Sequence, residues 1–213
     1  LFREFLFISV WAILLTSCFV YRFLATCERT GTRSIDKIFD LACGHGLVGI
    51  MLAYAYPDRT VMACDRKRRE SFEAFNAAFA HFARLEETSP ENFHLSDIEP
   101  VESVDGALKP QLANLTFVEG ELDVLSPHVD SASLVLALHG CNEANKESMR
   151  MAVDNNALWC VMPCCIRGDL YLPQCTMSKM TDDQRYAFMC GAMACEYGAQ
   201  MARCIDRRIT NRA

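Results

Sequence analysis

Three glycines and two acidic residues have the types and spacing expected of a site for an adenosine-containing cofactor. Residues 40–49 read Asp-Leu-Ala-Cys-Gly-His-Gly-Leu-Val-Gly, and Asp65 follows Gly44 by 21 residues. Glycines allow a tight turn and leave room for a ligand close to the backbone. The first amides of a following helix would face the polar end of that ligand. An acid at the end of the next strand can accept hydrogen bonds from both ribose hydroxyls.

Two cofactor classes fit this pattern, and the position of Asp40 separates them. Gly44, Gly46 and Gly49 match the dinucleotide fingerprint, which predicts NAD. Asp40, however, lies four residues before the first glycine, where its charge would crowd a pyrophosphate. The same acid can hold the ammonium group of a methionine moiety, directly or through water. A dinucleotide enzyme would also need more sheet and a substrate domain than this chain length allows. The pattern therefore favours S-adenosylmethionine over NAD.

The elements that would position this site alternate between short apolar strands and helices. Continuous apolar strands, rather than alternating ones, are typical of a parallel sheet with helices on both faces. We therefore expect an α/β, Rossmann-like fold, and the family resemblance described below implies the strand order 3-2-1-4-5. The predicted strands span residues 37–43, 60–64, 115–119, 133–139 and 157–162, and the predicted helices span 46–56, 72–85, 143–155 and 182–197.

These elements predict one domain that is preceded by a hydrophobic N-terminal segment, the leader. Residues 1–33 form the leader, residues 34–213 the domain, and residues 86–114 a polar surface insertion that is rich in proline. The final two strands of a seven-stranded sheet have no counterpart in the sequence. We therefore expect an exposed edge at the strand over 157–162, through which the chain pairs with a second copy or a partner protein.

The apolar segment over residues 5–21 has two interpretations. Its 17 uncharged residues are just enough for a membrane anchor. Alternatively, the segment is a hydrophobic helix packed on the domain, which we favour. The 12 cysteines are scattered and several lie within apolar runs, which indicates free thiols in a reducing, cytoplasmic setting.

The net charge of −6 argues against a surface that grips nucleic acid by itself. If RNA is the substrate, a partner protein or another segment is expected to supply the positive charge.

The loop and its neighbours resemble the motifs of class I methyltransferases. Residues 40–49 resemble motif I, Cys64-Asp65 resembles motif II, and residues 117–122 resemble motif III. Two further stretches, 137–144 and 161–166, resemble a group that includes the Trm13-like and glutathione S-transferase C-terminal-domain-like methyltransferases. The group has a His-x-Cys-Gly loop where this chain has His-Gly-Cys-Asn, and this chain lacks the histidine that often follows the cysteine pair.

The resemblance and the strand positions together predict the site residues. His139 is the candidate general base, because the loop after the fourth strand projects toward the cofactor. A zinc site built from His139, Cys141, Cys164 and Cys165 is disfavoured by their spacing, and no metal is expected. The cofactor-binding residues are expected to be Asp40, Ala42, Gly44, His45, Gly46, Gly49, Asp65, Arg66, Glu121 and Leu122.

The function predicted from these features is S-adenosylmethionine-dependent methyl transfer, with RNA, in particular tRNA, as the leading acceptor. The alternatives are a non-catalytic Rossmann-like interaction module and an NAD-binding oxidoreductase. An intact loop with Asp65 favours the enzyme over the module.

Overall fold

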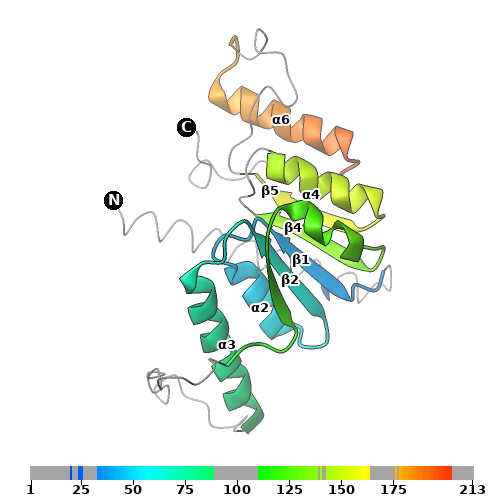
Figure 1. Ribbon diagram of the computed structural model, residues 1–213. Coiled ribbons are helices and arrows are strands. Elements are labelled where there is room, and N and C mark those ends of the chain that lie inside the picture. The colour runs from blue at the N-terminus through cyan, green and yellow to red at the C-terminus, as the bar shows by residue number, and fades with distance from the viewer. Residues whose placement is uncertain are drawn as a thin grey trace.

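The computed structural model describes residues 20, 24–25, 33–88, 110–138, 140, 143–163, 176 and 178–202. Within them, five parallel strands form one sheet in the order β3-β2-β1-β4-β5, which confirms the predicted fold class (Figure 1). The strands are β1 Lys37–Leu41, β2 Thr60–Asp65, β3 Leu115–Glu119, β4 Ser133–Leu138 and β5 Leu158–Met162. The helices are α2 Leu47–Ala55, α3 Glu70–Thr88, η2 Leu122–His128, α4 Glu143–Asp154 and α6 Asp182–Glu196.

The two faces of the sheet pack into two separate apolar clusters. Successive side chains of a strand point to opposite faces. Ile38 of β1 accordingly belongs to the cluster with Val61 and Leu134, whereas Phe39 belongs to the cluster with Val135. The strands are mostly apolar in sequence, rather than alternating, because both of their faces are covered.

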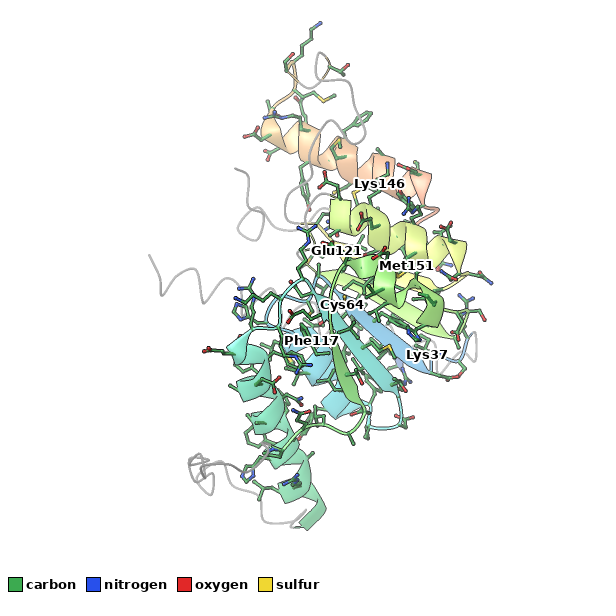
Figure 2. All side chains as sticks on the ribbon, viewed as in Figure 1. Lys37, Cys64, Phe117, Glu121, Lys146 and Met151 are labelled. Carbon is green, nitrogen blue, oxygen red and sulfur yellow. The ribbon has the colours of Figure 1, made fainter. Side chains whose placement is uncertain are left out.

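Different helices cover the two faces (Figure 1). Helices α2 and α3 pack together on one side of the sheet, and η2 and α4 pack on the other. Helix α6 lies beside α4, where Lys146 pairs with Glu196 at 3.6 Å (Figures 1 and 2). The Tyr186 hydroxyl of α6 donates to the carbonyl of Pro163, just after β5, at 2.8 Å. Helix α6 begins with the capping box of Thr181 and Gln184.

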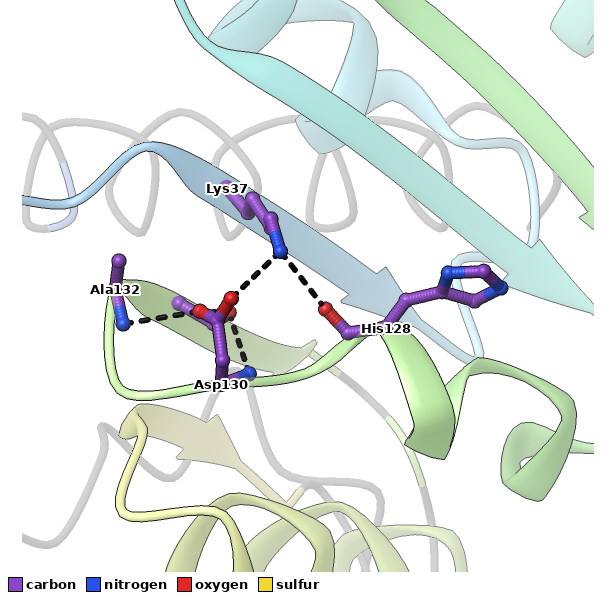
Figure 3. Close-up of polar contacts among 5 residues, drawn as sticks. Lys37, His128, Asp130 and Ala132 are labelled. Atoms are coloured by element: carbon purple, nitrogen blue, oxygen red, sulfur yellow. Dashed lines mark hydrogen bonds and ion pairs between the residues drawn. The ribbon is translucent and has the colours of Figure 1, made fainter.

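A polar cluster fastens the amino-terminal ends of β1 and β4 (Figure 3). Lys37 Nζ lies 2.6 Å from Asp130 Oδ2 and donates to the carbonyl of His128 at 3.3 Å. The Asp130 carboxylate also accepts from the Ala132 amide and the Ser133 hydroxyl. The bond with Lys37, followed by that with Ser133, lowers the pKa of Asp130. The side chains at this end of the sheet thus bind one another, so we expect a ligand at the carboxyl ends of the strands.

The polar segment predicted as an insertion over residues 86–114 is integrated with the domain at both ends. Helix α3 continues to Thr88, and Leu112 is buried while its amide donates to Asn76 Oδ1 at 3.0 Å. Asn114 Nδ2 donates to three carbonyls, those of Ala53, Tyr56 and Arg59, at 2.9–3.0 Å. These bonds fix the start of β3 against the end of α2. Residues 89–109 lie outside the described part of the chain.

The hydrophobic leader contributes to the core. Val20 and Leu24 are 1% and 0% exposed and belong to the cluster on the face of α2 and α3. The other residues of the 5–21 segment lie outside the described residues. Among the helices that the structure describes, none is long and apolar enough to cross a membrane.

Candidate cofactor site

The predicted cofactor loop connects β1 to α2 in an unusual backbone conformation. Ala42, Gly44 and Gly46 have φ values of 52°, 59° and 68°. Positive φ disfavours residues with a Cβ, so Ala42 is strained, and such strain is common at functional sites. The Cys43 amide donates to the carbonyl of Cys64 at 3.1 Å, which extends the pairing of β1 with β2 into the loop.

The glycines of this loop serve different purposes. A Cβ on Gly44 would meet no atom within 4 Å, so its side of the loop is open to a ligand. A Cβ on Gly46 would lie 2.3 Å from Phe72 Cδ2 of α3. The sequence argument assigned both glycines to the approach of a ligand. The structure adds a second requirement at Gly46, because the absence of a Cβ there makes room for the core ring of Phe72.

Asp40 lies beneath the loop rather than at its surface. Its side chain is buried, and Oδ2 accepts from the Gly49 amide at 2.8 Å. A Cβ on Gly49 would lie only 3.0 Å from that oxygen, so a larger residue would press against the Asp40 carboxylate. Burial raises the pKa of Asp40 to about 7, the Gly49 amide opposes the rise, and the charge of Asp65 adds to it.

Asp65 binds the same loop from the end of β2. Its Oδ2 accepts from the Gly44 amide at 2.7 Å, which holds the loop and β2 together. Its Oδ1 makes no hydrogen bond with the described residues. A partly exposed carboxylate therefore faces the open side of Gly44 with one oxygen free to accept a hydrogen bond.

The remaining predicted cofactor residues surround this carboxylate. His45 Nδ1 lies 2.5 Å from Ser71 Oγ, next to the start of α3. The Glu121 carboxylate pairs with Arg66 Nε at 3.1 Å, and both side chains are mostly exposed. Leu122 is buried in the cluster with Leu125 and is not at the surface. Figure 2 shows Glu121 and Lys37 at opposite ends of the sheet, with Glu121 at the carboxyl end.

The predicted general base, His139, lies outside the described residues, as do Cys141, Cys164 and Cys165. Helix α4, which follows that loop, contains a residue that the sequence analysis missed. Asn145 is 2% exposed, and among the described residues neither its Nδ2 nor its Oδ1 has a hydrogen-bond partner. A Cβ on Gly140 would lie 3.5 Å from Asn145 Oδ1, so the amide adjoins the loop after β4. Leaving such a group unpaired is costly, and a polar ligand group would satisfy it.

The described cysteines are free thiols, and three of them are shielded from solvent. Cys43, Cys64, Cys160, Cys190 and Cys195 carry no disulfide. Burial raises the pKa of Cys43, Cys64 and Cys160, the last two to about 11, so these thiols are poor nucleophiles at neutral pH. Within the described ranges, no three His, Cys, Asp or Glu side chains come together as a metal site.

The fold and the loop define a class: a Rossmann-like domain with a glycine loop after β1 and an acid after β2. The sequence model of a methyltransferase-domain family matches residues 17–168, well over half of the chain. The chain therefore belongs to this methyltransferase-domain family. The match begins before Val20 and Leu24, in agreement with their place in the core. Among curated proteins, none matches the chain significantly.

Proposed function

We propose that the chain transfers a methyl group from S-adenosylmethionine to an RNA acceptor, with tRNA as the first candidate. The observation that carries the proposal is the Asp65 carboxylate, bound to the Gly44 amide beside the open side of the loop. Asp65 Oδ1 would accept from the ribose hydroxyls. Asp40 would stabilise the ammonium group of the methionine moiety from beneath the loop. Glu121 would accept from the adenine amine.

The cofactor supplies a methyl group that is already activated on a sulfonium, so the protein chiefly has to position the acceptor. The loop after β4 lies at the carboxyl edge of the sheet, beside the strand that carries the cofactor loop. His139 would accept the proton of an acceptor hydroxyl, and the buried amide of Asn145 would hold a polar group of the acceptor.

The resemblance to the Trm13-like group supports tRNA as the acceptor, through the stretches around His139 and Cys164.

The rival function is a non-catalytic module that retains the fold. The intact glycine loop with Asp40 and Asp65 favours the enzyme, because a module that binds no cofactor tends to lose this set of residues.

A transfer assay with methyl-labelled cofactor tests the proposal against total RNA and total protein from the source cell. We expect label in the tRNA fraction, and His139→Ala should lower turnover while the cofactor dissociation constant stays within a few-fold. Label in protein alone would overturn the acceptor, and no transfer to either fraction would favour the module. Equal losses of turnover and cofactor affinity would show that His139 is structural.

A further inference from the structure

A run of four cations follows Asp65 directly at the carboxyl edge of the sheet. Arg66, Lys67, Arg68 and Arg69 connect β2 to α3, and all four are exposed. The run adjoins the cofactor loop, because Asp65 binds the Gly44 amide and Ser71 contacts His45. Any ligand that reaches over the open side of Gly44 from this direction must pass these side chains.

Two of the four cations are already engaged by the protein. Arg66 pairs with Glu121. Arg68 pairs with Glu73 at 2.9 Å, donates to the Phe117 carbonyl at 3.2 Å, and lies 4.9 Å above the Phe117 ring. Arg68 thus fastens the start of α3 to β3 and is structural. Lys67 and Arg69, by contrast, have no ion pair or side-chain hydrogen bond with the described residues.

Lys67 and Arg69, the two free cations, lie where positive charge is unfavourable unless an anion is bound nearby. They precede a helix of 19 residues, and the positive end of a helix dipole disfavours cations. Glu70 and Glu73 in the first turn offset part of this charge, but Glu73 is taken by Arg68. A bound anion would relieve the repulsion among the remaining cations.

The net charge of the chain hides this basic surface. Residues 86–105 contain seven acidic residues and no Lys or Arg, so their net charge is −7, whereas the net charge of the whole chain is −6. The rest of the chain therefore has a net charge of +1. The sequence argument that a net charge of −6 leaves no surface for nucleic acid is thus weakened for the domain itself.

We propose that Lys67 and Arg69, presented by the 66–69 run beside the cofactor loop, bind the phosphate backbone of the RNA acceptor. The inference rests on the proposed function for the identity of the acceptor. Lys67 and Arg69 alternate in sequence with the paired cations Arg66 and Arg68. The RNA backbone is a polyanion that fits such a run, because its closely spaced phosphates can each contact one cation. The contact would set the position of the acceptor relative to the cofactor without reading its sequence.

The test compares two double variants of the full chain in binding to a labelled, unmodified tRNA transcript over a KCl series. Lys67→Ala/Arg69→Ala removes the two free cations. Arg150→Ala/Lys179→Ala removes two exposed cations from α4 and from the segment before α6, and so matches the change in net charge. We expect the first variant to bind about tenfold more weakly at low salt, with its log-log salt slope reduced by about two. The control should bind tRNA like the wild type, and both variants should keep the wild-type melting temperature and cofactor affinity.

Several results would overturn the inference. One is an equal loss of tRNA binding in both double variants, which would indicate a general charge effect. A second is unchanged tRNA binding in Lys67→Ala/Arg69→Ala. A third, from a parallel assay with vesicles of anionic phospholipid, is that this variant loses binding to the vesicles but not to tRNA. Because tRNA binding is measured without cofactor, it can fail while S-adenosylmethionine still binds. In that case this contact is wrong and the proposed cofactor chemistry stands.

Discussion

At the scale of single residues, the loop between β1 and α2 combines one glycine that lies beside open space with one that faces the core. Gly44 has positive φ and open space beside it, whereas Gly46 has positive φ and the Phe72 ring beside it. The two positions are alike in sequence but should respond differently to the same substitution.

We predict that Gly46→Ala lowers stability and that Gly44→Ala mainly lowers cofactor affinity. Gly46→Ala combines left-handed strain with overpacking against Phe72, about 2–5 kcal/mol in total. Gly44→Ala incurs only the strain, about 1–2 kcal/mol. Urea unfolding and calorimetry with S-adenosylmethionine measure the two effects. Equal stability losses in the two variants would contradict the assignment of Gly46 to the core.

Asp40 should make both stability and cofactor affinity depend on pH. Its pKa is 3.8 without the fold and about 7 within it, so between these values the folded protein binds more protons than the unfolded chain. The contribution of Asp40 to the free energy of unfolding therefore falls as pH rises from about 4 to about 7, by a few kcal/mol. The affinity for S-adenosylmethionine should rise over pH 6–8, because a cofactor ammonium favours the ionised carboxylate.

The control for this dependence is Asp40→Asn, which retains an acceptor for the Gly49 amide but cannot ionise. Its cofactor affinity should be flat over the same pH range. A wild-type affinity that does not change with pH would exclude a direct role of the Asp40 charge in binding.

At the scale of elements, the N-terminal segment supplies two residues of the core, in agreement with the interpretation of a hydrophobic segment packed on the domain. Val20 and Leu24 are fully buried on the face of α2 and α3. We predict that Leu24→Ala lowers the free energy of unfolding by about 2–5 kcal/mol, as for other buried leucines. Val124→Ala, at a position that is 45% exposed, should cost much less.

A chain that begins at Ser34 extends this test. It should melt at a lower temperature than the full chain and still bind the cofactor, because every predicted cofactor residue follows Ser34. An unchanged melting temperature would show that residues 1–33 do not belong to the core.

The strands were predictable because each is a short, mostly apolar run that is followed within a few residues by glycine or proline, or that ends on an acid. The observed β3, for example, coincides with the predicted 115–119 strand. The sequence did not predict the 3-10 helix η2, because Pro127 and its polar neighbours Ser126 and His128 are typical of a turn. The roles of Gly46 and Asn145 were also beyond the sequence. Both depend on contacts made across the fold, with Phe72 of α3 and with the loop after β4.

At the scale of the whole molecule, the two ends of the sheet carry different kinds of residues. Its amino-terminal end is fastened by Lys37 and Asp130, and its carboxyl end carries the glycine loop, Asp65 and the 66–69 run. In the described part of the chain, β5 pairs with β4 alone and its five side chains are half-buried. Self-association through this edge stays a prediction, which light scattering of the full chain checks.

The central claim is that the loop and Asp65 form a site for S-adenosylmethionine, and calorimetry of the full chain tests it most directly. We predict that the wild type binds S-adenosylmethionine and not NADH, and that Asp65→Ala weakens binding by about 1–3 kcal/mol. Glu119→Ala is the matched control, because it removes an acid from the end of the adjacent strand, where the carboxylate accepts only from Arg68. It should bind like the wild type. Binding of NADH without S-adenosylmethionine, or full affinity in Asp65→Ala, would contradict the account.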